Sequence, residues 1–286
     1  MLELWKDQLK RMYFIGKCKY LLGMLAEGHP YTWFIVRRLL HRLIIFLPHD
    51  ESYYAFKHLS SNAEGLLIDV GANDGISALA FRRFNKTYKI LSLEPNPFHE
   101  AKLKNVKSRI NDFDYLMVGA GDQEGEIELY VPIYGGVAIH PAACLDYKLL
   151  QKTMRTIYPV FVSSKMKYVK QTVKIITIDS LNLHPTLVKI DAEGADYRVL
   201  LGMRKTIERT RPCILLELSP DMVGTLEQFC QEIDYEVFSY SYKIDKFIPF
   251  KSSHLRNMTG YRNAFCLPAE KVKILPVFES EVDEPK

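Results

Sequence analysis

The chain has 286 residues, of which 48% are hydrophobic and 25% charged, a composition that fits a globular protein and excludes a fibrous or disordered one. The formal net charge is +4, and the whole excess lies in residues 1–50, so the rest of the chain is neutral. A neutral main domain does not suggest nucleic-acid binding.

The first part of the chain, residues 1–55, is predicted to be a basic, amphipathic helical extension. Within it, residues 33–47 (WFIVRRLLHRLIIFL) place arginines on one face and leucines on another. This run is too short and too charged to span a bilayer, which needs about 20 apolar residues. Two interpretations stay open: an interfacial helix in peripheral contact with anionic lipid, or a helix packed on the main domain with its basic face in water.

From residue 56 to residue 270, apolar runs alternate with helical segments, which predicts a doubly wound, mostly parallel α/β sheet. The expected strands are 66–70, 89–93, 114–118, 187–190, 213–218, 235–239 and 264–267. The expected crossover helices are 76–84, 97–106, 195–208 and 222–233.

Two more segments, 126–131 and 172–178, alternate apolar and polar residues as strands do. Between them lies 132–170, which is long for an ordinary connection and holds a helix-like stretch at 145–156. Such an insertion in an α/β enzyme is either a lid over the active site or a surface excursion. Residues 271–286 are an acidic tail, and the part after Pro276 is expected to be solvated and loosely ordered.

The most informative motif is LLIDVGANDG, followed by LSLEP at residues 91–95. A strand ends in Asp69, a glycine turn and a helix follow, and a second strand carries Glu94 at its tip, an order that holds a nucleoside in a βαβ unit. A dinucleotide fingerprint would need glycines at the positions of Asn73 and Ile76, so it is not met. The pattern favours S-adenosylmethionine, a cationic ligand without phosphate that needs carboxylates.

In this interpretation Asp69 serves the ammonium group of the ligand, directly or through water, and Glu94 accepts both ribose hydroxyls. Glycine and asparagine tolerate the positive φ that the turn needs. The residues assigned to the cofactor are Asp69, Gly71, Asn73, Asp74, Gly75 and Glu94.

Six ordered blocks resemble the FkbM family of S-adenosylmethionine-dependent methyltransferases. They are IDVGANDG (68–75), LEPNPFHEAKLKN (93–105), GAGDQEGEIELYV (119–131), ITIDSL (176–181), LVKIDAEGADYRVLLGM (187–203) and RPCILLEL (211–218). The resemblance implies a class I methyltransferase (Rossmann-like) fold with a seven-stranded sheet whose last strand is antiparallel. It also implies that Gly121 and Asp122 lie near the adenine, and that the reaction is an O-methylation. One departure is Gly119, where the family usually has alanine.

The segment KIDAEG places Asp191 and Glu193 at the carboxyl end of a predicted central strand. Three interpretations stay open: a general base for the acceptor hydroxyl, ligands of Mg²⁺, or caps of the following helix. The metal interpretation is the least favoured, because only two close acids are evident. Lys189 is expected to pair with a neighbouring acid. His140, in the insertion, is a further candidate base because its ordinary pKa suits proton transfer near neutrality.

The sequence therefore predicts an S-adenosylmethionine-dependent O-methyltransferase that acts on a hydroxyl of a sugar, a glycan or a related small metabolite. The alternatives are a nucleotide-cofactor oxidoreductase and a catalytically degenerate, membrane-associated binding module. Five scattered cysteines without a CxxC pair, and an N-terminus without the pattern of a signal peptide, predict a cytoplasmic protein. Contact with the inner face of the membrane through 33–47 remains an alternative, and oligomeric state is not indicated.

Overall fold

The computed structural model describes residues 50–60, 64–139, 146–192, 194–219, 222–250 and 262–278. The chain forms two compact units, and within the described residues the smaller is Glu128–Gln171 and the larger comprises the rest. The amphipathic run 33–47 lies outside the described residues, as do the candidate bases His140 and Glu193. The predictions made for these three therefore stay predictions.

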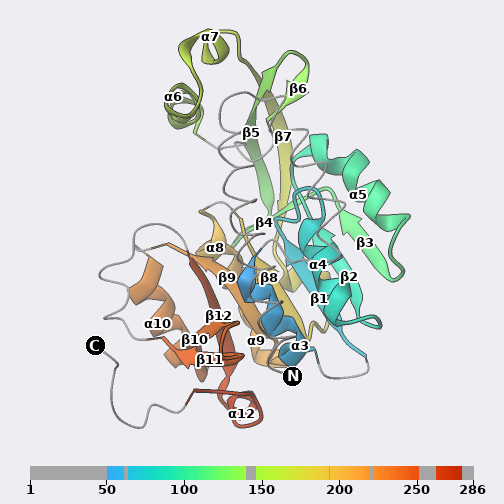
Figure 1. The fold of residues 1–286 in the computed structure, drawn as a ribbon, viewed down its shortest axis with the longest axis vertical. Coiled ribbons are helices and arrows are strands. Elements are labelled where there is room, and N and C mark those ends of the chain that lie inside the picture. Colours follow the sequence, from blue (N-terminus) through green and yellow to red (C-terminus); the bar gives the residue numbers. More distant parts are fainter. Residues whose placement is uncertain are drawn as a thin grey trace, which may run out of the picture. The chain divides into compact units, whose positions relative to one another are not determined.

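The larger unit is built on an eight-stranded sheet with the order β11-β10-β12-β9-β8-β1-β2-β3 (Figure 1). The strands are β1 Leu66–Val70, β2 Lys89–Leu93, β3 Phe113–Leu116, β8 Leu187–Ile190, β9 Cys213–Leu218, β10 Tyr235–Ser241, β11 Lys246–Pro249 and β12 Arg262–Pro268. β12 runs antiparallel between β9 and β10. The expected class I methyltransferase sheet is confirmed, and β11 widens it by one strand beyond the seven predicted.

Both faces of this sheet are buried, which explains why its strands are continuous apolar runs. Leu67 packs into one core cluster with α4 and α5, and its neighbour Ile68 packs into another with α8, α9 and α10. The helices are α4 Ile76–Phe84, η2 Pro97–His99, α5 Glu100–Lys107, α8 Asp196–Leu201, α9 Arg204–Thr210 and α10 Val223–Glu232. The helix predicted over 195–208 is divided at Gly202, where a Cβ atom would lie 1.8 Å from the carbonyl oxygen of Gly121.

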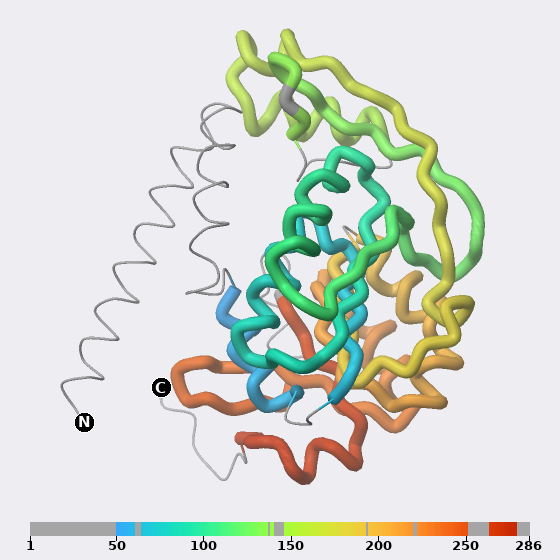
Figure 2. Tube along the Cα trace, turned by 90° about the vertical axis from the view of Figure 1, so that its right-hand side faces the viewer, coloured from blue at the N-terminus to red at the C-terminus, as the bar shows by residue number. Residues whose placement is uncertain are grey.

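The described chain enters the larger unit through η1 (Glu51–Ala55) and α3 (Phe56–Leu59). Tyr53 is 4% exposed and belongs to the core cluster of α4 and β1. Asp50 accepts a hydrogen bond from the Ser52 backbone at 2.7 Å and one from the Asn263 side chain at 2.8 Å, which ties η1 to β12. Figure 2 shows this blue segment beside the orange hairpin of β10 and β11. The residues just before 56 are thus part of the core.

The smaller unit contains β6 (Val137–Ala138), α6 (Tyr147–Ile157), α7 (Val160–Ser163), most of β5 (Gly125–Tyr134) and the first half of β7 (Lys167–Ile176). These strands form a second sheet of order β4-β7-β5-β6, in which β4 is Gly119–Ala120. Leu150 and Met154 of α6 are buried in a separate, small hydrophobic core. The described part of the predicted insertion is therefore folded around apolar residues of its own. A lid role for it remains a prediction.

Residues 277 and 278 depart from the prediction of a loose tail after Pro276, and 279–286 lie outside the described residues. α12 (Ala269–Val272) follows β12, and Val277 then pairs with Phe247 of β11. The backbone N–H of Phe278 donates to the Phe247 carbonyl at 2.7 Å. These contacts hold residues 277 and 278 against the sheet edge. Among the described residues, none of the helices has the length and apolar character needed to cross a membrane.

Candidate active site

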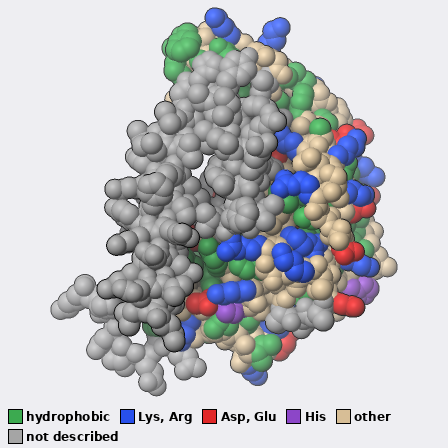
Figure 3. Space-filling model, turned by 45° about the vertical axis from the view of Figure 1, so that its right-hand side comes forward, with side chains coloured by type: hydrophobic (Ala, Val, Ile, Leu, Met, Phe, Trp, Pro, Cys, Tyr) green, Lys and Arg blue, Asp and Glu red, His purple; other side chains and the backbone are tan. Residues whose placement is uncertain are grey.

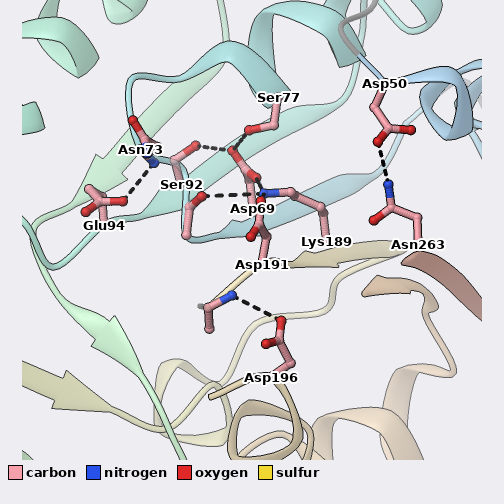
Figure 4. Close-up of polar contacts among 12 residues, drawn as sticks. Asp50, Asp69, Asn73, Ser77, Ser92, Glu94, Lys189, Asp191, Asp196 and Asn263 are labelled. Atoms are coloured by element: carbon pink, nitrogen blue, oxygen red, sulfur yellow. Dashed lines mark hydrogen bonds and ion pairs between the residues drawn. The ribbon is translucent and has the colours of Figure 1, made fainter. Parts of the chain in front are cut away.

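Three carboxylates lie where neighbouring parallel strands end. β1 lies between β2 and β8, and the strand ends Val70, Leu93 and Ile190 are aligned in register. Asp69 and Glu94 therefore come from adjacent strands, and Asp191 follows the third (Figure 4). The carboxyl edge of an open α/β sheet is where such folds bind ligands.

The glycine turn after β1 is pressed against the strand ends. Gly71 has φ +71°, Asn73 +52° and Gly75 +80°, so the backbone takes the left-handed conformation three times in five residues. The N–H of Gly71 donates to the carbonyl of Leu93 at 2.9 Å. A Cβ atom on Gly71 would lie 1.8 Å from the carbonyl oxygen of Asp191, so only glycine fits there.

Asp69 is fully buried, with an exposed fraction of 0%. Its Oδ2 accepts hydrogen bonds from the hydroxyls of Ser77 at 2.6 Å and Ser92 at 3.0 Å. Its Oδ1 lies 3.6 Å from the Nζ of Lys189 and has no hydrogen-bond donor among the described residues. One oxygen of a buried carboxylate is thus left able to accept a hydrogen bond from a ligand or from water.

Glu94 is held by the backbone on both sides. Its Oε2 accepts the N–H of Asn73 at 2.7 Å and its Oε1 accepts the N–H of Asn96 at 2.8 Å. Burial raises the pKa of this carboxyl to about 7, against the effect of these two hydrogen bonds. Of the nearby charges, Lys189 lowers this pKa and Asp69 raises it. Each oxygen keeps a lone pair for a further donor.

Lys189 lies between the acids, with only 6% of its side chain exposed. Its Nζ lies 3.1 Å from Asp191 Oδ2 and 3.4 Å from the carbonyl oxygen of Gly71. Burial opposes the charged form, but Tyr53, Asp191 and Asp69 together raise the pKa of Lys189 above its ordinary value. The predicted pairing of Lys189 with a neighbouring acid is confirmed.

The loop after β8 is closed by Asp196 and not by Asp191. The Asp196 carboxylate accepts the N–H of Ala192 at 3.1 Å and the N–H of Gly194 at 3.2 Å, and burial raises its pKa. α8 begins at Asp196, and its N-cap residue, Ala195, makes no side-chain hydrogen bond to the helix. The cap interpretation is therefore wrong for Asp191, whose side chain is 41% exposed.

The segment predicted to lie near the adenine follows β4. The N–H of Gly121 donates to the carbonyl of Ile176 at 3.0 Å. Asp122 accepts a hydrogen bond from the Arg198 guanidinium at 2.9 Å, which lowers the pKa of that carboxyl. At Gly119, a Cβ atom would lie 3.5 Å from Pro95, which follows Glu94, and 2.5 Å from the Ile175 side chain. The small residue at this position thus makes room for Ile175.

Asp74 is fully buried, at 0% exposed. Several partners at this edge were not foreseen: Ser77, Ser92, Asp196, Tyr53 and the Asp50–Asn263 pair. Ser92 could have been found, since it sits opposite Asp69 in the β1–β2 register. Within the described residues, no group of three or more His, Cys, Asp or Glu side chains could hold a metal ion.

The Methyltransferase FkbM domain model matches residues 69–244, which is more than half of the chain and includes the glycine turn, Glu94 and the Asp191 loop. The chain belongs to the FkbM methyltransferase family. No curated protein matches it.

Solved structures similar to this FkbM family member include methyltransferases from several bacteria. Methyltransferase FkbM from Methylobacillus flagellatus has 16% identity and a TM-score of 0.45 over 71% of this chain, which spans only 44% of that protein. A putative caffeoyl-CoA O-methyltransferase from Staphylococcus aureus has 9% identity and a TM-score of 0.42, over 91% of this chain and 99% of that one. Precorrin-6y C5,15-methyltransferase from Geobacter metallireducens has 11% identity and a TM-score of 0.38, over 75% and 86%.

The family implies S-adenosylmethionine as the cofactor, and the side chains at this edge fit it. The ligand carries a sulfonium, an ammonium group and two ribose hydroxyls, all of which favour acceptor oxygens. The edge offers the donor-free Oδ1 of Asp69 and a Glu94 carboxylate whose two oxygens each accept one backbone N–H. Gly71 and Gly75 carry no side chain, so the turn beside these acids adopts its positive φ angles without strain.

Proposed function

We propose that this protein is an S-adenosylmethionine-dependent O-methyltransferase whose acceptor is a hydroxyl of a sugar, a glycan or a related metabolite. The observation that carries the proposal is the buried Glu94 carboxylate, fixed by two backbone N–H groups beside the donor-free oxygen of Asp69. An acid held in this way, without a salt bridge of its own among the described residues, fits a pair of ligand hydroxyls.

In this proposal Glu94 accepts both ribose hydroxyls, and Asp69 serves the ammonium group directly or through water. Gly121 and Asp122 lie beside the adenine, as family resemblance suggests. When bound, the cofactor supplies a methyl group activated by its sulfonium charge. The protein aligns the acceptor oxygen and excludes water, which are the contributions a methyltransferase scaffold makes.

Asp191 is the proposed general base. Its side chain is half exposed at the strand end, where an acceptor can approach, unlike the fully buried Asp69. Lys189, 3.1 Å from its Oδ2, fixes that oxygen and leaves Oδ1 as the atom that takes the hydroxyl proton. A positioned carboxylate that removes this proton during attack contributes about 10²–10⁴-fold to the rate.

Calorimetry tests the cofactor site directly. The intact protein is expected to bind S-adenosylmethionine and its demethylated product, and Glu94→Ala should weaken both by about 1.5–3 kcal/mol, the range for hydrogen bonds to a charged group. Glu124→Ala, which removes an exposed acid from the turn before β5, is the matched control and should bind normally. Absence of binding by the intact protein would refute the proposal.

The acceptor is found by incubating the protein with methyl-labelled cofactor and extracts of metabolites or cell envelope, followed by mass spectrometry. The expected product carries the label on an oxygen of a sugar or related metabolite. A label found on nitrogen, sulfur or carbon contradicts the O-methylation proposal while leaving cofactor binding intact.

A further inference from the structure

A hollow of about 410 Å³ lies where the C-terminal end of α4 meets the loop between α5 and β3. We call it the Arg82 pocket, and the polar side chains that line it are Arg82, Arg83, Lys86, Arg109 and Asn111. The loop leads into β3, and the carbonyl of Asp112 accepts the N–H of Ile90 near the start of β2. The pocket is therefore at the amino edge of the parallel strands, opposite the edge that carries Asp69 and Glu94.

Arg82 is buried in this pocket in an unusual way. It is 8% exposed, and its Nη2 donates to the carbonyl of Asn111 at 2.9 Å. Its Nε and Nη1 are also buried and have no acceptor within the described residues. Burial lowers the pKa of this guanidinium, with Asp112 acting in the opposite direction. A buried charge with two unused donors is costly unless an acceptor comes to it.

Three more cations surround Arg82. Arg83, Lys86 and Arg109 are exposed, and across the part of the chain that the structure describes none has a carboxylate within ion-pair distance. Figure 3 brings forward the side of the larger unit that carries α4 and α5, and Lys and Arg side chains gather there. Cations near a helix C-terminus are common because they complement its dipole. That effect explains Arg83 and Lys86, but it does not explain why Arg82 buries two unused donors.

We propose that the Arg82 pocket binds a phosphate group. A guanidinium donates N–H hydrogen bonds to phosphate oxygens, and Nε and Nη1 of Arg82 are the donors left for them. The three exposed cations around it attract a doubly charged anion. The hollow is much larger than one phosphate, so the remainder of a phosphate ester fits in it. The same group could come from a soluble phosphate ester or from the headgroup of an anionic phospholipid. The proposal is independent of methyl transfer, since the two sites lie at opposite edges of the sheet.

The test compares two double variants of the full chain. Lys86→Ala with Arg109→Ala removes two exposed cations from the pocket, and Lys174→Ala with Lys205→Ala removes two exposed cations elsewhere, so the net charge changes equally. Pyrophosphate is titrated by calorimetry, and binding to phosphatidylcholine vesicles with and without phosphatidic acid is measured by flotation. Arg82→Lys is added as a variant that keeps the charge and loses the Nε and Nη1 donors.

A loss of at least about tenfold in pyrophosphate affinity in the pocket variant, but not in the control, supports a soluble phosphate ligand. The same selective loss in vesicle binding alone supports a phospholipid headgroup. Equal binding by the two double variants in both arms overturns the proposal, and so does absence of binding by the unaltered protein in both arms. Since the lost cations are exposed, the pocket variant should fold, and the result does not depend on whether Arg82→Lys does.

Discussion

Lowering the pH from 8 to 6 is expected to weaken cofactor binding through Glu94. Burial raises the pKa of this carboxyl to about 7, so about nine-tenths of the protein holds it ionised at pH 8 and about one-tenth at pH 6. A protonated carboxyl has only one oxygen left as a full acceptor, so it cannot accept both ribose hydroxyls. If binding requires the carboxylate, the measured Kd rises about tenfold, or about 1.4 kcal/mol.

The same shift has the opposite sign for the stability of the ligand-free fold. On folding, the pKa of this carboxyl rises from 4.5 to about 7. Below pH 4.5 it is protonated in both states and does not change the free energy of unfolding, whereas above pH 7 it is ionised in both states and lowers that free energy by the full amount. The free energy of unfolding should therefore fall by about 3 kcal/mol as the pH rises through this window. Ligand binding and ligand-free stability thus respond to pH in opposite directions.

The assay is calorimetric titration of the demethylated product at pH 6, 7 and 8, in two buffers with different ionisation enthalpies. The buffer dependence counts protons, and nearly one should be released per ligand bound at pH 6. Glu94→Gln keeps the shape without the titration, so its weaker binding should not vary with pH. A wild-type Kd that is the same at pH 6 and 8, or a slope that persists in the Gln variant, would refute the reasoning.

Three other substitutions are informative. Lys189→Met leaves the buried Asp69 without its cation and should lower the free energy of unfolding by about 3–5 kcal/mol in a denaturant titration; a change below about 1 kcal/mol contradicts the ion pair. Gly71→Ala should abolish folding or cofactor binding, because the new Cβ would lie 1.8 Å from the Asp191 carbonyl oxygen. Gly194→Ala is the control: φ is +90° there but the space is open, so backbone strain should lower the free energy of unfolding by only about 1–2 kcal/mol in thermal unfolding. Asp191→Asn should slow turnover at unchanged cofactor affinity, and full activity in this variant would exclude the base role.

The central strands could be predicted to the residue because burial on both faces leaves no choice of pattern. β1, β2, β8 and β9 have the predicted bounds, each an apolar run closed by a turn or a charged residue. The ends of the segment 132–170 were harder to predict, because β5 runs on to Tyr134 and β7 already begins at Lys167, both as half-exposed strands. Their mixed burial removes the contrast between core and surface on which a sequence pattern depends.

At the candidate site, acids at strand ends could be predicted but their partners could not. Asp69 and Glu94 could be placed at the same edge of the sheet because their strands are consecutive and parallel. The hydrogen bond of Lys189 to Gly71 and the electrostatic interaction of Lys189 with Tyr53 join segments more than a hundred residues apart. Only the folded chain brings them together. The role of Asp196 was not predicted, because three acids follow β8 within six residues. The local sequence does not show which of them accepts hydrogen bonds from the backbone of the loop.

The packing of η1 against the core bears on how shortened versions of this protein should be prepared. A version that starts at residue 60 would lack Phe56, which is 1% exposed, and would uncover apolar side chains along α4 and β10, inviting aggregation during expression. A version that starts at residue 50 keeps the hydrogen bond between Asp50 and Asn263 and the buried aromatic residues Tyr53 and Phe56. Crystallisation trials and proteolytic trimming should therefore respect that boundary.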